Sequence, residues 1–323
     1  MPYARPPGLY DRDVEWSDLI GFVSAKRSRL GLGLVYGRRR FGNSFLLRRL
    51  VDAVGGVYHL ALEESRAPAL GRFAATVGSL YTPAAPVTFD GWDAALRSAV
   101  GVLGKRETPQ LLILDEYPYL RAQSPELDSV IQALVDDVAG GSLGADWQSR
   151  VSIIVCGSAF SVMTDLLSGT APLRGRAVLD LPLHSFDYRQ SRDFWQVADP
   201  ETAFLLHSIV GGAAGYRDLT GGVAAPERPN EIADWSAATI LNPSHALSGK
   251  TSTCYGRTHE YPRRPSTTRF SVRWRPARRL SVRSPACWDA RASTWAIRSG
   301  CWCRPVSSPA KRICLSHRTR CFE

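Results

Sequence analysis

The segment that most restricts the fold lies at residues 32–54. Residues 32–36 (LGLVY) are a short apolar run, residues 37–44 (GRRRFGNS) contain two glycines, and leucines and valines then recur at helical spacing through residue 54. This order predicts a buried strand, a tight loop and an amphipathic helix. A chain that contains such a unit is expected to fold as an α/β protein in which helices cover a sheet.

Further apolar runs continue this pattern along the chain. Residues 56–62 (GVYHLAL), 111–115 (LLILD) and 151–156 (VSIIVC) each have the length of a buried strand, and residues 178–183 are a candidate fifth strand. Stretches with helical periodicity separate these runs. Because strands that alternate with helices form βαβ units, we predict a parallel sheet of about five strands flanked by helices.

The loop at residues 37–44 fits the phosphate-binding pattern G-x-x-x-x-G-K-[ST] at every fixed position but one. Gly37, Gly42 and Ser44 match, whereas Asn43 stands where the pattern has lysine. The glycines allow backbone N–H groups to curl around phosphate oxygens, the helix N-terminus adds partial positive charge, and the Ser44 hydroxyl can bind Mg²⁺. The residues expected to contact a nucleotide are Gly37, Arg38, Arg39, Arg40, Phe41, Gly42, Asn43, Ser44 and Phe45. The alternative is an ordinary glycine-rich turn between a strand and a helix.

Polar residues follow two of the other predicted strands. The run at 111–115 closes with Asp115 and is followed by Glu116, and the run at 151–156 is followed by a glycine and Ser158. Parallel strands would bring these ends to one edge of the sheet, beside the glycine-rich loop. Asp115 can hold Mg²⁺ through water, Glu116 can orient the attacking water, and Ser158 can sense a γ-phosphate. The alternatives are a strand end capped by solvated acids and, for Ser158, a helix N-cap.

Several motifs between residues 9 and 247 together resemble those of the archaeal-type ATPases, an AAA+-related, STAND-like branch of the P-loop NTPases. The motifs are Asp11-Arg12 with Glu15-Trp16, LGLVYGRRRFGNSFLL, LLILDEYPYL, IIVCGSAFSVM, SGTAPLRGR and LPLHSFDYR. The resemblance implies the P-loop NTPase fold and the ligands ATP and Mg²⁺. It also places Arg174 and Arg176 where the family carries basic residues after the fourth strand, as a phosphate sensor or arginine finger. A surface loop charge is the alternative for these two residues.

Asn43 departs from the family pattern LVYGRRRxGK[ST], to which the three arginines of the loop belong. A hydrogen bond to a charged group contributes roughly 1.5–3 kcal/mol, against about 0.5–1.5 kcal/mol for a neutral one. The larger loss is expected in the transition state, where charge develops on the reacting groups. We therefore expect an ATP-binding protein whose hydrolysis is weakened. The alternatives are a non-hydrolysing, nucleotide-dependent regulatory module and a truncated, non-functional product.

The resemblance also implies a domain organisation. The expected parts are a lead segment at 1–30, an ATPase-like α/β domain at 31–193, a helical lid at 194–247 and a tail at 248–323. Helical patterns at 203–219, broken at two glycines, and at 230–246, as a helix pair, predict the helices of the lid. Members of the family continue into a winged-helix domain, which is not recognisable here after residue 247. We therefore expect the outer apolar face of the lid to lack its cover, including Leu205, Leu206, Ile209, Ile232 and Ile240.

The tail at 248–323 differs in composition from the rest of the chain. It holds 17 Lys and Arg against 3 Asp and Glu, and six of the seven Cys. GC-rich coding DNA read out of frame gives such a composition, so we interpret the tail as a frameshift product, and its low apolar content predicts disorder. One alternative is zinc ligation by Cys301, Cys303, Cys314, His317 and Cys321. Another is designed binding of nucleic acid by residues 263–279, where arginines and aromatics alternate. Non-specific binding to nucleic acid is expected from the charge alone.

Other features exclude whole classes of protein. No apolar run approaches the ~18 residues that a transmembrane helix needs. The N-terminal residues carry prolines and charges in place of the apolar segment of a signal peptide. We therefore expect a cytoplasmic protein that binds nucleotide and does not enter a membrane. Its protein partner and its oligomeric state are not indicated by the sequence.

Overall fold

The computed structural model describes residues 3–27, 29–81, 83–139 and 150–248, and two short strands at 296–298 and 301–303. These residues fall into two separate units, a larger one within Met1–Tyr261 and a smaller one within Pro262–Glu323. The larger unit contains the sheet and all the helices described below.

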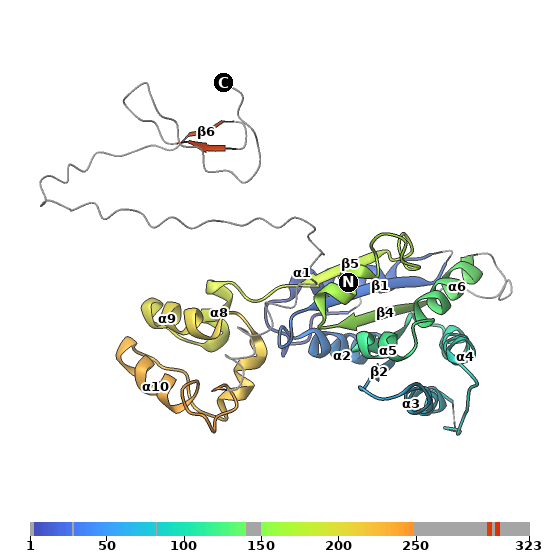
Figure 1. The fold of residues 1–323 in the computed structure, drawn as a ribbon, viewed down its shortest axis with the longest axis horizontal. Coiled ribbons are helices and arrows are strands. Elements are labelled where there is room, and N and C mark those ends of the chain that lie inside the picture. The colour runs from blue at the N-terminus through green and yellow to red at the C-terminus, as the bar shows by residue number, and fades with distance from the viewer. Residues whose placement is uncertain are drawn as a thin grey trace, which may run out of the picture. The chain divides into compact units, whose positions relative to one another are not determined.

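A parallel sheet of five strands forms the centre of the larger unit (Figure 1). The strands are β1 (Gly31–Gly37), β2 (Gly56–Leu60), β3 (Gln110–Asp115), β4 (Val151–Gly157) and β5 (Leu179–Leu183). They lie in the order β2-β3-β4-β1-β5, and every neighbouring pair is parallel. The three central strands are buried along their whole length, as their continuous apolar runs predict. The predicted sheet of about five strands is confirmed.

Helices cover both faces of this sheet. One face carries α1 (Asp13–Ser24) and α2 (Asn43–Val54), whose apolar residues pack on Leu111 and Ile113 of β3. On the other face, helices pack on Leu112 and Leu114 of the same strand. This face carries α3 (Arg66–Gly78), α4 (Trp92–Gly104), α5 (Tyr117–Gln123), α6 (Leu127–Ala139) and α7 (Phe160–Asp165). Alternate residues of a strand point to opposite faces, so the sheet is the middle layer of three. The lead segment at 1–30 thus contributes α1 to the α/β core.

The connections place the chemically important residues together. Because all strands run in one direction, their carboxyl ends meet at a single edge of the sheet. The glycine-rich loop follows β1, Asp115 ends β3, and Ser158 directly follows β4. These strands are neighbours in the order β3-β4-β1, with β2 beside β3.

Three further helices follow the sheet. They are α8 (Tyr188–Trp195), α9 (Pro200–Val210) and α10 (Ile232–Ala238). Between α9 and α10 lie short 3₁₀ turns at Ala214–Tyr216, Asp218–Thr220 and Pro229–Glu231. The expected second helix within 203–219 and the expected helix pair at 230–246 are therefore wrong. Glycines at positive φ interrupt the chain at 211, 221 and 222, and a proline begins the last 3₁₀ turn.

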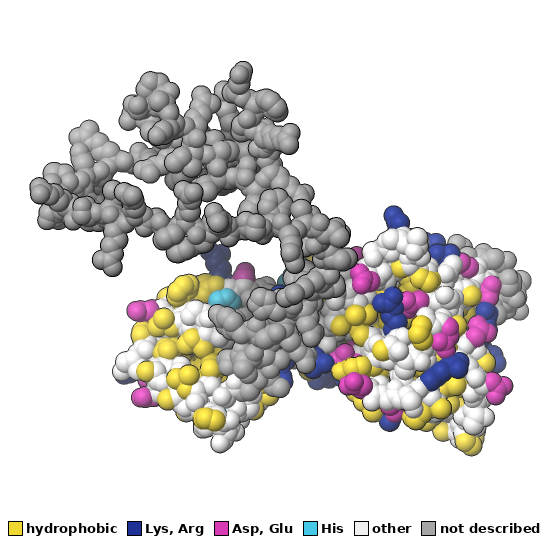
Figure 2. Space-filling view, viewed as in Figure 1, with side chains coloured by type: hydrophobic (Ala, Val, Ile, Leu, Met, Phe, Trp, Pro, Cys, Tyr) yellow, Lys and Arg dark blue, Asp and Glu magenta, His cyan; other side chains and the backbone are white. Residues whose placement is uncertain are grey.

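These helices enclose a small apolar core of their own. Its buried members are Trp195, Val197, Ala203, Leu206, Val210, Trp235 and Leu247. Leu206 belongs to this core and is 1% exposed, so the expectation that it lies on an uncovered outer face is wrong. Ile209 on the same helix is exposed, as are Phe204 and Leu241. Figure 2 shows hydrophobic side chains on the visible face of this helical region.

The smaller unit is described only as a two-stranded antiparallel ladder. It pairs β6 (Ala296–Arg298) with β7 (Cys301–Cys303). The predictions of tail disorder, zinc ligation and nucleic-acid binding otherwise fall outside the described residues. Among the described residues, no helix combines the length and the apolar character needed to cross a membrane.

Candidate functional site

The glycine-rich loop joins the carboxyl end of β1 to the first turn of α2, and its two glycines meet different needs. A Cβ atom at Gly37 would lie 2.7 Å from the Leu183 carbonyl oxygen. Gly42 adopts a φ of 96°, which favours glycine, and a Cβ there would have no neighbour within 4 Å. Gly42 is also the N-cap of α2, and no side chain caps this helix end. No side chain therefore takes up the first N–H groups of α2, and such groups can bind an anion.

Asn43, which stands in place of the expected lysine, turns back onto the strand. Its Nδ2 donates a hydrogen bond to the Gly37 carbonyl oxygen at 3.0 Å, and the side chain is buried. Its Oδ1 is also buried and has no hydrogen-bond partner within the described part of the chain. Asn43 thus closes the base of the loop with a neutral bond and supplies no positive charge to a phosphate.

Asp115 and Ser44, the residues expected to hold Mg²⁺, both lie beside the side chain of Tyr58. Asp115 is 1% exposed and accepts hydrogen bonds from the Tyr58 hydroxyl and, at 2.9 Å, from the backbone N–H of Glu116. Burial, followed by the Asp115 carboxylate, raises the pKa of Tyr58, so its phenol is neutral, and the nearby Ser44 opposes this shift. The side chains of Ser44, Tyr58 and Asp115, from three different elements, therefore lie close together.

Glu116 and Ser158 also meet at this edge of the sheet. Ser158 Oγ donates a hydrogen bond to the Glu116 carboxylate at 3.4 Å. Burial, followed by the charge of Asp115, raises the pKa of Glu116, and Arg39 opposes this shift. The backbone of Glu116 has a φ of 54°, which is uncommon for a residue other than glycine and clusters at functional sites. The structure thus brings together the two residues that the sequence assigned to the reacting phosphate.

The remaining residues of the loop lie around this centre. Arg38 and Arg39 are exposed, and Arg39 donates a hydrogen bond to the Tyr119 hydroxyl at 3.2 Å. Arg40 has a φ of 72° and lies over the Tyr216 ring at 6.0 Å. Phe41 is partly buried, whereas the Phe45 side chain is exposed on the first turn of α2. The loop therefore carries cationic side chains on its surface although it lacks the lysine.

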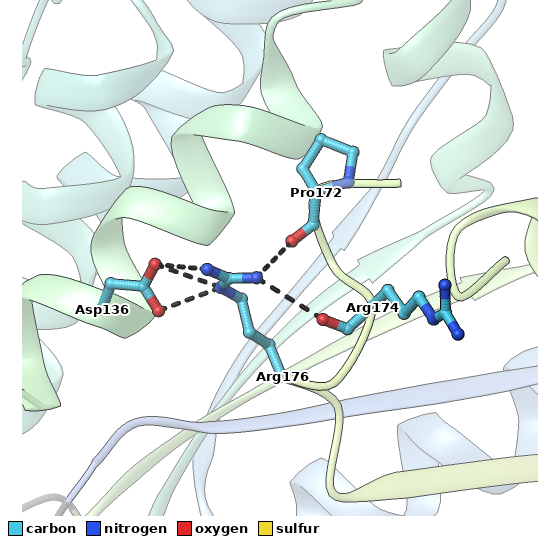
Figure 3. A network of polar contacts seen from close by, with 4 residues as sticks. All are labelled: Asp136, Pro172, Arg174 and Arg176. Atoms are coloured by element: carbon cyan, nitrogen blue, oxygen red, sulfur yellow. Dashed lines mark hydrogen bonds and ion pairs between the residues drawn. The ribbon is translucent and has the colours of Figure 1, made fainter. Parts of the chain in front are cut away.

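Arg174 and Arg176 are not brought to the loop. The Arg176 guanidinium forms a two-pronged ion pair with Asp136 of α6, with a shortest distance of 2.7 Å, and donates to the carbonyl oxygens of Pro172 and Arg174 (Figure 3). Arg174 points away from this network and donates to the Gly169 carbonyl oxygen at 2.6 Å. Both precede β5, whose first residue pairs with Gly33 in the first half of β1. This geometry fits the alternative of a surface loop charge.

Arg12 is a buried residue that contacts the glycine-rich loop and to which sequence reasoning assigned no role. Its side chain is buried, and it donates to the carbonyl oxygens of Phe41 at 3.1 Å and His184 at 2.8 Å. It also pairs with Glu15 at 2.7 Å and lies 4.9 Å from the centre of the Phe186 ring. Arg12 therefore ties the glycine-rich loop to the end of β5. Its only sequence signal is its place in the first motif of the family resemblance.

The segment after α9 makes a second tie to the loop. Gly215 donates its backbone N–H to the Arg40 carbonyl oxygen at 3.0 Å, and a Cβ at Gly215 would meet the Arg40 side chain at the same distance. Three residues earlier, the Gly212 carbonyl oxygen accepts a hydrogen bond from the Phe186 N–H at 2.9 Å. The helical region thus contacts the loop directly through its backbone.

Comparisons with known proteins agree with this geometry. No family model matches the chain. The Walker-type ATPase of Pyrococcus abyssi superposes with a TM-score of 0.56 at 17% identity, over 82% of this chain and 79% of that chain. The ORC2 protein of Aeropyrum pernix, solved as ADPNP–ADP complexes, superposes with a TM-score of 0.50 at 15% identity, over 72% and 69%. The chain therefore has the P-loop ATPase fold that its motifs predict.

A curated sequence relative is an uncharacterized protein of Methanocaldococcus jannaschii. It is 24% identical over 184 residues, which make up 57% of this chain. The matched region covers only 38% of the length of that protein. The chain thus matches well under half the length of that relative, and the function of the whole protein is left to be proposed.

Proposed function

We propose that this chain binds ATP at the glycine-rich loop and that its hydrolysis of ATP is weakened by Asn43. The observation that carries the proposal is the open first turn of α2 beside converging side-chain oxygens. Gly42 leaves that helix end without a side-chain cap, and Asp115 bonds to the Tyr58 hydroxyl close to Ser44. An uncapped helix N-terminus binds phosphate, and hydroxyl and carboxylate oxygens are the donors that Mg²⁺ prefers. The ATPase fold of the Pyrococcus protein supports the same assignment.

The residues present also fit a divalent cation. Ser44 and Asp115 would hold Mg²⁺, which neutralises charge on the phosphates when it is bound. Glu116 lies directly after Asp115 and would orient the attacking water. Its raised pKa reflects burial, and Ser158 fixes its carboxylate by a hydrogen bond. These side chains would supply a cation site and a water-orienting carboxylate, without the charge that a lysine would provide.

The role of Asn43 distinguishes a weakened ATPase from a module that binds nucleotide without hydrolysing it. Its amide is bonded to the Gly37 carbonyl oxygen, so it neither reaches a ligand nor carries charge. This observation also favours the second candidate, a module that binds nucleotide without hydrolysing it. In both proposals the nucleotide is a ligand of the loop, and they differ only in turnover.

The test is a calorimetric titration of the full chain with ATP in Mg²⁺, with Asp115→Ala as the site variant. We expect wild type to bind ATP, and Asp115→Ala to lose the part of the affinity that depends on Mg²⁺. Arg174→Ala is the matched control, because Arg174 donates to Gly169 away from the loop and should leave binding unchanged. No binding by wild type would refute the proposed nucleotide site.

Asn43→Lys then separates the two candidates. In the enzyme, a basal turnover is measurable in wild type, and the lysine raises it because it adds charge where the transition state develops charge. By analogy with other electrostatic groups, the gain is about 10²–10³-fold. In the non-hydrolysing module, wild type binds ATP with no release of phosphate above that of the Glu116→Gln variant.

A further inference from the structure

We propose that Tyr58 occupies the position of the divalent cation and must leave it before a nucleotide binds together with Mg²⁺. This inference rests on the proposed nucleotide site and adds a residue that controls its dependence on the cation. Tyr58 lies on β2, which pairs directly with β3, the strand that ends in Asp115. It belongs neither to the loop nor to the acidic pair at the end of β3.

The hydrogen bonds of Tyr58 define the position that it fills. Its hydroxyl donates to the Asp115 carboxylate, and the Ser44 side chain lies nearby. The phenolic oxygen thus lies against one of the two groups assigned to Mg²⁺ and near the other. Mg²⁺ requires ligands at about 2.0–2.1 Å in octahedral geometry, so it cannot share this point with a neutral phenol. The ion and the Tyr58 hydroxyl are therefore alternatives for one place.

The surroundings of Tyr58 both hold the ring and leave space beside it. The Arg48 guanidinium of α2 lies over the ring at 4.0 Å from its centre, a cation–π contact at the protein surface. Next to the ring is a surface hollow of about 320 Å³. It is lined by Phe45, Arg48, Arg49, Val51, Asp52 and Tyr58. The ring can turn into this hollow once its hydroxyl is released, without disturbing the buried strands.

The consequence is a measurable competition. In wild type, Mg²⁺ must displace the hydrogen bond from the Tyr58 hydroxyl to Asp115 before it meets Ser44 and Asp115. Removal of the hydroxyl abolishes this competition, while the ring and its contact with Arg48 remain. We expect Tyr58→Phe to increase the gain in ATP affinity that Mg²⁺ provides by about ten-fold. ATP affinity in excess EDTA should stay the same.

The experiment compares the full-length wild type, Tyr58→Phe and a control, Tyr81→Phe. The Tyr81 hydroxyl hydrogen-bonds to Ser98 of α4, so its loss tests for a general effect of removing a tyrosine hydroxyl. The dissociation constant for ATP is measured in Mg²⁺ and in EDTA for each protein. The quantity compared is the ratio of the constant in EDTA to the constant in Mg²⁺. A ratio that rises in Tyr58→Phe alone supports the inference. A ratio equal to that of wild type overturns it.

A second measurement does not depend on nucleotide. Mn²⁺ is titrated into each protein without ATP, and free Mn²⁺ is followed by electron paramagnetic resonance. Tighter Mn²⁺ binding by Tyr58→Phe than by wild type supports the exchange between phenol and cation, even if ATP binding fails and the proposed function is lost. Equal Mn²⁺ affinity in all three proteins overturns the inference. The proposed nucleotide site is then tested separately by the ATP titration.

Discussion

Gly212 is the residue where a single added methyl group should disturb the packing of the segment after α9 against Phe186, which follows β5. A Cβ atom there would lie 1.8 Å from the carbonyl oxygen of Phe186 and 2.7 Å from its nitrogen. Both neighbours are backbone atoms, so no flexible side chain can move aside. The Gly212→Ala variant must therefore push the two segments apart.

The expected cost follows from the contacts that would be strained. Overpacking of a well-packed site costs about 1–3 kcal/mol, and the hydrogen bond from Phe186 to Gly212 contributes about 1 kcal/mol. We expect Gly212→Ala to lower the free energy of unfolding by about 2–4 kcal/mol. With a urea m-value of about 3 kcal/mol per molar, the denaturation midpoint should fall by about 1 M. Tryptophan fluorescence can follow the transition, because Trp195 and Trp235 lie in the core of the helical region.

The same substitution elsewhere should act in the opposite direction. Gly71 lies within α3, is exposed, and has no neighbour within 4 Å of a Cβ position. Gly71→Ala should raise stability by about 0.5–1 kcal/mol because alanine favours the helix. Gly212→Ala should also weaken ATP binding, since Gly215 holds the Arg40 carbonyl three residues further on. A midpoint for Gly212→Ala at or above that of wild type would refute the reasoning.

Two further predictions concern charged groups. Glu116→Gln should keep or tighten ATP binding and abolish residual phosphate release, because a carboxylate that orients water acts on the reaction more than on the ground state; unchanged release would remove Glu116 from that role. His59 is buried, and burial, followed by Arg72, lowers its pKa to about 4 from 6.5. Its contribution to stability is complete above pH 6.5 and is lost as the pH falls toward 4, by up to about 1.4 kcal/mol per pH unit. Urea denaturation of His59→Phe should therefore show a weaker dependence on pH between 6.5 and 4 than wild type; equal slopes would contradict this assignment.

The elements that local patterns encode could be predicted from the sequence. Continuous apolar runs predicted β1, β3 and β4, since a strand buried on both faces requires apolar side chains at every position. The edge strands β2 and β5 are only partly buried and were predicted from the length of their runs. The polar residues after these runs, Asp115 and Ser158, lie at one edge because parallel strands end together. The start of α2 at Asn43 follows from the glycine that precedes it.

The contacts that complete the site could not be predicted, because they join distant residues. Tyr58 has the character of an ordinary strand residue, and only the pairing of β2 with β3 brings its hydroxyl to Asp115. Arg12 donates to the carbonyl oxygen of Phe41, which is 29 positions away in the loop, and to that of His184, which is 172 positions away after β5. Arg176 lies in the SGTAPLRGR motif, but this position does not indicate where its side chain points, and the side chain pairs with Asp136. No local pattern contains such information.

These contacts explain how the loop keeps its shape with Asn43 in place of the lysine of the motif. The base of the loop is held by Asn43 on Gly37, its middle by Gly215 on Arg40, and its end by Arg12 on Phe41. Three protein groups therefore fix the loop without any help from a phosphate. A lysine at position 43 would add charge for the reaction, but the shape of the loop does not depend on it. Asn43 removes a charge that serves the transition state and leaves in place the backbone that binds phosphate, and this is why we expect affinity for ATP to exceed what its turnover would suggest.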